Sequence, residues 1–197
     1  MSGWRRCRHA NIVRAIVNAI VNIDPVQPAP EPESEPVVVR VHALGTDALR
    51  AMFAEHGLTL HTVADDEEIP GSYWGETEAG LVGSTLYVRD DTPVHSVLHE
   101  GCHWLCMDAA RRQSVHTDAN GDQDEEMAVC CLQALLADRI AGYSRAQLFI
   151  DMDAWGYGFV LGSAAAWFAQ EGSESMVWLR NHGMIDAAQQ LLGPRVG

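Results

Sequence analysis

The pattern of hydrophobic and polar positions divides the chain into three parts. In residues 1–24, isoleucine, valine and alanine are interrupted by polar residues at helical spacing, which indicates a short amphipathic helix. Residues 25–36 alternate proline with acidic residues, a composition that favours an extended linker over a packed core. From Val37 onward, apolar residues recur with strand and helix periods, so we expect one folded domain over residues 37–197.

The first half of this domain is predicted to mix strands with one helix. Thr46 and Gly57 are placed to begin and end that helix. Gly80 and Gly83 stand at bulge or edge positions of the strand region that follows. The predicted strands are rich in β-branched or aromatic residues or alternate apolar and polar positions, the last two segments forming one or two strands: 37–44, 58–63, 73–75 and 81–88.

The second half is predicted to be mainly helical. Residues 90–93 end the strand region and cap a helix that runs to about residues 108–110. A polar loop over 111–123 separates it from a second apolar helix over 124–137. Residues 144–193 have a helical pattern with breaks at glycines 156, 158 and 172, and the last helix ends at residues 181–183.

Charge and cysteine content restrict the class of protein. The net charge is −14, and an acidic surface argues against nucleic acid as a partner, since phosphate binding requires basic residues. The five cysteines are odd in number and show no paired zinc signature, so we expect reduced thiols and a cytoplasmic location. Residues 1–24 are too short and too polar to cross a bilayer. For this segment we favour docking on the domain, or a weakly structured extension, over contact with a membrane.

The first predicted helix carries a pattern typical of metal binding, His99-Glu100-x-x-His103. At about 100° per residue, the two histidines lie about 40° apart on one face, so both imidazoles can bind one ion. Glu100 faces the neighbouring sector, where a carboxylate can deprotonate a metal-bound water. The alternative is that both histidines are solvated side chains on the surface of the helix. The apolar neighbours Leu98 and Leu105 argue against this alternative, because they indicate a buried helix, and burying two histidines and a glutamate without partners is costly.

A catalytic zinc site needs a third protein ligand. Glu125 begins the second apolar helix and shares its face with Val129 and Leu132, so we prefer it as this ligand. Glu126, on another stripe of the same helix, is the rival, and either acid could instead be a helix-terminal charge. Cys106 lies on the histidine side of the first helix, where we expect it to pack in the core.

These residues resemble a known family of zinc enzymes. His99-Glu100-x-x-His103, followed by Glu125-x-x-Ala128 and a pair of leucines at 135–136, looks like a gluzincin-type metallopeptidase, most similar to the ImmA/IrrE-like proteases. The resemblance covers roughly residues 80–137. It implies a zincin-like α+β fold, in which a small mixed sheet packs on the active-site helix and the C-terminal part is mainly helical.

The same resemblance implies roles for individual residues. His99, His103 and Glu125 would bind Zn²⁺, and Glu100 would be the general base. The strand at about residues 80–89 would be the edge along which an extended peptide pairs. The sequence itself offers three candidates for the oxyanion donor and does not select among them: Tyr73, Tyr157 and His182.

We therefore predict a zinc-dependent metallopeptidase that hydrolyses a protein or peptide substrate. A non-catalytic, zinc-binding regulatory or interaction protein is the alternative, which the five thiols, with Cys106 close to the metal face, keep open. Interaction through the amphipathic N-terminal segment is a third possibility. The sequence contains no G-x-S-x-G nucleophile turn and no phosphate-binding glycine loop, which argues against serine hydrolase and nucleotide-binding chemistry.

Overall fold

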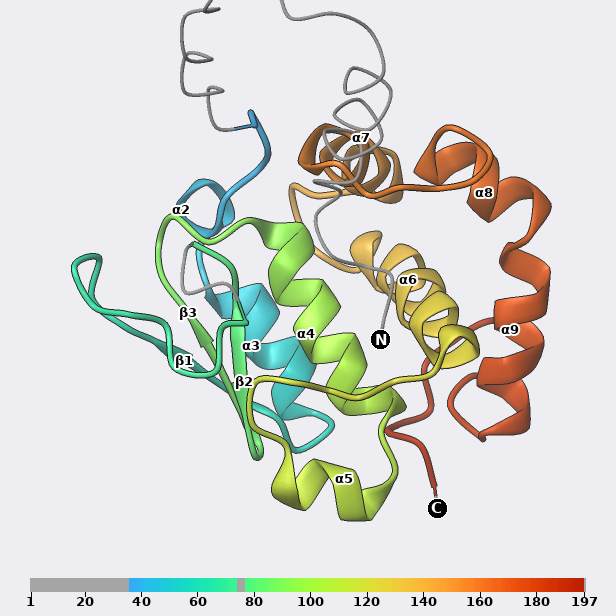
Figure 1. The fold of residues 1–197 in the computed structure, drawn as a ribbon, viewed down its shortest axis with the longest axis horizontal. Coiled ribbons are helices and arrows are strands. Elements are labelled where there is room, and N and C mark those ends of the chain that lie inside the picture. The colour runs from blue at the N-terminus through green and yellow to red at the C-terminus, as the bar shows by residue number, and fades with distance from the viewer. Residues whose placement is uncertain (1–35, 74–76, 197) are drawn as a thin grey trace, which may run out of the picture.

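The computed structural model describes residues 36–73 and 77–196 of the chain (Figure 1). The predicted amphipathic segment 1–24 lies outside the described residues, as does the predicted linker except Pro36. Within the described ranges the chain forms eight helices and a small mixed sheet, which confirms the α+β class. The strands and helices are β1 (Thr59–Thr62), β2 (Gly80–Val82), β3 (Thr85–Val88), α2 (Val41–Leu44), α3 (Asp47–Ala54), α4 (Val94–Cys106), α5 (Ala109–Ser114), α6 (Gln123–Ala137), α7 (Arg145–Trp155), α8 (Ala164–Gln170) and α9 (Gly172–Asn181).

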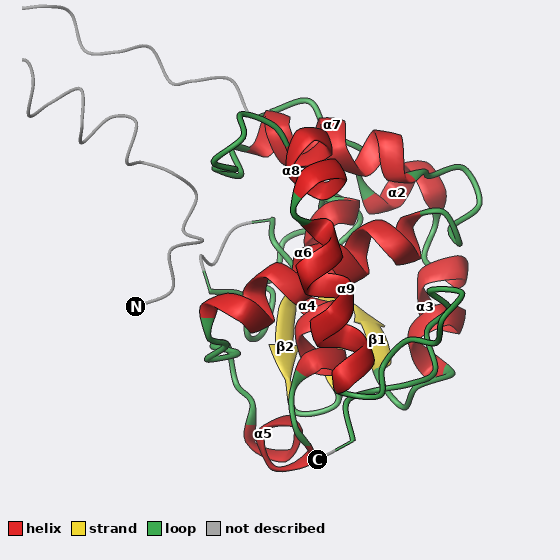
Figure 2. Ribbon diagram, turned by 90° about the vertical axis from the view of Figure 1, so that its right-hand side faces the viewer, coloured by secondary structure: helices red, strands yellow, loops and turns green. Residues whose placement is uncertain are grey.

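The sheet has the order β1-β3-β2 and carries α4 on one side (Figures 1 and 2). β2 and β3 form a hairpin whose turn contains Gly83 at φ +55°, so the predicted segment 81–88 is two strands. β1 pairs with β3 in parallel, which requires a crossover and brings residues 59–62 beside residues 85–88. The strand predicted over 58–63 is confirmed.

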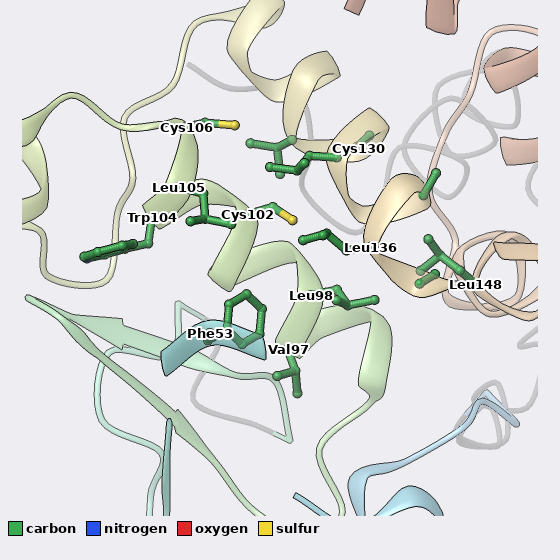
Figure 3. Packing of buried hydrophobic residues seen from close by; sticks show 14 of the residues in the cluster. Phe53, Val97, Leu98, Cys102, Trp104, Leu105, Cys106, Cys130, Leu136 and Leu148 are labelled. Atoms are coloured by element: carbon green, nitrogen blue, oxygen red, sulfur yellow. The ribbon is translucent and has the colours of Figure 1, made fainter. Parts of the chain in front are cut away.

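Helix α4 lies between the sheet and α6, and this position explains its burial (Figures 1 and 3). Eleven of its thirteen residues are buried, among them Leu98, Cys102 and Leu105. The two that keep partial exposure are His99 and Glu100. The helix therefore opens to solvent only beside the H-E-x-x-H motif.

Two predictions of secondary structure were wrong, the strand over residues 37–44 and the loop over all of residues 111–123. Residues 37–44 are an extended segment followed by the short helix α2, because their backbone pairs with the turn before α4: Val41 N donates to Thr92 O at 2.9 Å, and Val94 N donates to Val39 O at 2.9 Å. α4 ends at Cys106, close to the predicted end at about residues 108–110. Asp108 then caps a new helix, α5, within the region predicted as a loop. Of the segment 73–75, Tyr73 is in a bend and the rest lies outside the described residues.

The C-terminal helices agree with the predicted pattern. Gly156 ends α7 with φ +92°, in the left-handed region, and α9 begins at Gly172. α6 packs against α4, α7 and α9, so it is the central helix of this half. Among the described residues, no helix has the length and apolar character needed to cross a membrane.

Gly101 allows α3 and α4 to approach closely, and its replacement is a test of this packing. A Cβ at Gly101 would lie 2.2 Å from Cζ of Phe53, whose ring is fully buried. We expect Gly101→Ala to lower the free energy of unfolding by about 1–3 kcal/mol, because overpacking outweighs the better helix propensity of alanine. Urea denaturation measures the effect. Gly172→Ala is the control, since its Cβ would lie 3.4 Å from Phe168. Equal stability of Gly101→Ala and wild type would contradict this packing.

Candidate metal centre

The side chains of His99 and His103 meet on one face of α4. Their Nε2 atoms are 3.1 Å apart, and Nε2 of His103 is 3.5 Å from Oε2 of Glu126 at the start of α6. One ligand atom from each of the three residues lies within 4.8 Å of the other two. Zinc with bonds of about 2.0–2.1 Å in tetrahedral geometry separates its ligand atoms by about 3.3 Å, so the spacing of these side chains suits such an ion.

The preferred third ligand, Glu125, is not brought to the histidines. Its carboxylate is held by Arg111 through two hydrogen bonds of 2.8 Å and approached by Arg195 at 3.4 Å. The side chain is 4% exposed, so these arginines compensate a buried charge. The rival residue Glu126 occupies the position beside His103.

The orientation of α6 explains this correction. Gln133 stands seven positions after Glu126 and therefore on nearly the same helical stripe. Its Nε2 donates to the backbone oxygen of His95 at 3.0 Å, which shows that this stripe faces α4. The stripe of Glu125 and Val129 is equally buried, but Glu125 is directed toward the arginines.

The candidate ligands have pKa values shifted toward their neutral forms. Burial lowers the pKa of His99 to about 4 and also lowers that of His103. Burial and then the charge of Glu125 raise the pKa of Glu126 to about 7. A divalent cation would reinforce the neutral form of both histidines and reverse the preference of Glu126, because it favours unprotonated histidine and ionised carboxylate.

Glu100 stands beside this group with a carboxyl surrounded by other acids. Burial raises its pKa to about 8, and the carboxylates of Glu78, Glu126 and Asp118 act in the same direction. Glu78 accepts a hydrogen bond of 3.0 Å from Nε1 of Trp155 on α7, which places an acid from the loop before β2 near the motif. The sequence analysis missed Glu78, because it lies in a short polar segment without a recognisable pattern.

Of the residues considered as oxyanion donors, Tyr157 lies nearest to a candidate ligand. Its ring centroid is 5.9 Å from that of His99, and burial raises the pKa of its phenol. His182 instead stacks on Trp178 with the ring centroids 3.8 Å apart. Tyr73 is exposed. Cys106 is fully buried in the core.

The predicted peptide-binding edge is already occupied in part. Residues 115–117, between α5 and α6, pair with the outer edge of β2: Gly83 N donates to Val115 O at 2.8 Å, and Thr117 N donates to Leu81 O at 3.0 Å. At the other end of β2, a Cβ on Gly80 would lie 2.1 Å from the backbone oxygen of Pro70. A peptide that pairs along residues 81–83 must therefore displace residues 115–117.

The shifted carboxyl groups predict how the stability of the metal-free protein depends on pH. Folding raises the pKa values of Glu126 and Glu100 from 4.5 to about 7 and about 8. Their contribution to the free energy of unfolding is therefore full below pH 4.5 and is lost as the pH rises through the pKa values of the folded protein. The lowered pKa of His99 opposes this change only below pH 6.5. We expect stability to fall by about 2 kcal/mol between pH 6.5 and 8.

Urea denaturation of chelator-treated protein at several pH values measures this change. The double variant with Glu100→Gln and Glu126→Gln should show a flatter profile. In the presence of zinc, the stabilisation should grow over the same interval, because the ion competes with the protons. Stability of the metal-free protein that rises from pH 6.5 to 8 would contradict these shifts.

In comparisons with known proteins, no family model, no curated protein and no solved structure matches the chain.

Proposed function

We propose that the protein is a zinc-dependent metallopeptidase with a zincin-like arrangement of sheet and active-site helix. The observation that supports it most is the convergence of His99, His103 and Glu126. Glu100 lies next to them, in the one sector of α4 that keeps partial exposure to solvent. Two histidines and a carboxylate are a ligand set of catalytic zinc sites, which keep a further position for water or substrate. The resemblance of the motif to gluzincins points in the same direction.

In the proposed reaction, His99, His103 and Glu126 hold the zinc ion. When bound, the ion supplies a Lewis acid that acidifies water and polarises a carbonyl group. Glu100 accepts the proton of the attacking water and passes it to the leaving amine. Burial, and after it the carboxylates of neighbours such as Glu78 and Asp118, raise its pKa, which makes Glu100 a stronger base than an ordinary glutamate. Tyr157, beside His99, is the candidate donor to the developing oxyanion.

A second candidate is a zinc-binding regulatory protein without peptidase activity. The observation that favours it is the pairing of residues 115–117 with β2, because this pairing fills the edge expected to receive a peptide. In that case the metal would stabilise the contact between α4 and α6, and Glu100 would have no catalytic role.

Metal removal and restoration test the proposal. We expect the purified full chain to contain one zinc ion, by elemental analysis, and to cleave members of a peptide library followed by mass spectrometry. Cleavage should stop after treatment with a chelator and return with added zinc. Cleavage that survives removal of the metal would refute the metallopeptidase. One bound zinc without cleavage would favour the regulatory alternative, and no bound metal would refute both.

A further inference from the structure

Gln133 is a buried polar residue that neither the ligand group nor the proposed reaction uses. It is 0% exposed in the middle of α6, between the apolar residues Leu132 and Ala134. Its Nε2 donates to the backbone oxygen of His95 in the first turn of α4. Its Oε1 is also buried, and the described part of the chain provides it with no hydrogen-bond partner at normal distance. A buried amide with only one of its two polar groups hydrogen-bonded is unfavourable, so we expect a second partner, one that donates to Oε1.

His99 presents the complementary atom. Its Nδ1 is buried, and within the described ranges it also has no hydrogen-bond partner at normal distance. The two side chains interact: burial lowers the pKa of His99, and Gln133 acts in the opposite direction. An amide oxygen can only accept, whereas an imidazole nitrogen that carries a proton can donate. The two unpaired atoms therefore match as acceptor and donor.

The backbone of α4 determines which way the amide points. A carbonyl oxygen can only accept, so the oxygen of His95 requires the NH₂ group of Gln133 to face it. Oε1 is then the amide atom available to His99 and to the phenol of Tyr157, the other side chain with which Gln133 interacts. A neutral imidazole has one proton, and a proton at Nδ1 leaves Nε2 with a free lone pair. Nε2 of His99 is the atom that lies 3.1 Å from Nε2 of His103.

We propose that Gln133 is a positioning residue, which accepts a hydrogen bond from Nδ1 of His99 and thereby directs the unprotonated Nε2 toward the group formed with His103 and Glu126. Histidines that bind metals generally need an acceptor of this kind behind the ring, because it fixes both tautomer and orientation. The effect on metal binding rests on the proposed zinc site. The hydrogen bond itself does not depend on zinc and is expected in the metal-free protein.

The tautomer of His99 in the metal-free protein is the first test. Nitrogen-15 NMR of the imidazole rings, with His99→Asn used to assign the signals, should show a proton on Nδ1 of His99. In Gln133→Met, which keeps the shape and removes the acceptor, this preference should be lost. A proton on Nε2 in the wild type, or an unchanged tautomer in Gln133→Met, would overturn the proposal. Because no metal is present, this result is independent of the proposed function.

Zinc affinity is the second test, and three variants separate positioning from packing. Gln133→Met should weaken zinc binding by about 10- to 100-fold in competition with a chromophoric chelator. Gln133→Glu keeps an acceptor oxygen and loses the donor to His95, so it should retain most of the affinity. Ser96→Ala removes a different buried hydrogen bond of α4, the one accepted from Ala79 N, and should leave zinc affinity unchanged.

The outcomes distinguish the two proposals. Equal affinity of wild type and Gln133→Met would overturn the positioning role. Loss of affinity in Gln133→Glu as large as in Gln133→Met would also overturn it, since the bond to His95 would then be what matters. If the wild type binds no zinc, the proposed function fails, and the NMR result alone decides whether Gln133 positions His99. Circular dichroism of each variant confirms that it is folded before these comparisons.

Discussion

Glu126→Gln is expected to weaken zinc binding by more than about 100-fold, whereas Glu125→Gln is expected to retain it within about tenfold. The difference follows from the positions of two adjacent carboxylates. Glu126 lies 3.5 Å from Nε2 of His103, and Glu125 is engaged by two arginines. An amide oxygen is a poorer zinc ligand than a carboxylate because it lacks the charge that compensates the ion. The two variants are matched in size and in the change of charge.

For the free energy of unfolding we expect the opposite order, with Glu125→Gln the more damaging of the two substitutions. Glu125→Gln leaves Arg111 and Arg195 without their shared carboxylate, and we expect the free energy of unfolding to fall by about 2 kcal/mol. The effect is smaller than for a fully buried pair, because the arginine side chains are 28% and 23% exposed. Glu126→Gln should stabilise the metal-free protein at pH 8, since it removes a buried acid whose pKa is raised to about 7. Loss of zinc in Glu125→Gln with retention in Glu126→Gln would restore the ligand set that the sequence analysis preferred.

The two histidines could be predicted from sequence because their relationship is local. A spacing of four on one helix fixes the relative direction of two side chains, whatever the rest of the chain does. His99 and His103 meet for this reason. The start of that helix is also a local feature: residues 90–93 were predicted to cap it, and Pro93 is its N-cap residue.

The third ligand depends on the rotation of one helix against another, which a single hydrophobic stripe does not determine here. α6 packs against α4, α7 and α9, so nearly every side of it is apolar. The partners that hold Glu125 come from 14 and 70 positions away in the chain. A polar residue within the apolar helix is the signal that could have been used. Gln133 shares the stripe of Glu126, and buried amides point toward polar partners.

Long-range pairing also accounts for the errors in the sheet. Val37, Val38 and Val39 have strong strand propensity, but β propensity has effect only where a neighbouring strand is available. Residues before α4 provide the hydrogen bonds instead. The pairing of residues 115–117 with β2 could not be predicted, because Thr117 has φ +69°, a conformation unusual for a β-branched residue.

Glu100→Gln is expected to lower the rate of peptide hydrolysis by about 1,000-fold or more while zinc content remains at one ion per chain. Glutamine has nearly the shape of glutamate and cannot accept the proton of the attacking water. Glu100 is not among the three residues whose ligand atoms converge, so its replacement should leave the metal in place. Elemental analysis and initial rates on the same preparation measure both quantities.

Glu78→Gln is the matched control for this experiment, and it tests the electrostatic part of the proposal as well. Its carboxylate raises the pKa of Glu100 after the larger effect of burial. Removing that charge should lower the pKa of Glu100, so the acidic limb of the pH–rate profile should move to lower pH while the maximal rate falls by less than about tenfold. Full activity of Glu100→Gln would exclude Glu100 as the base. If Glu100→Gln is inactive but the pH–rate profile of Glu78→Gln is not shifted, Glu100 remains the proposed base and the electrostatic coupling between Glu78 and Glu100 is refuted.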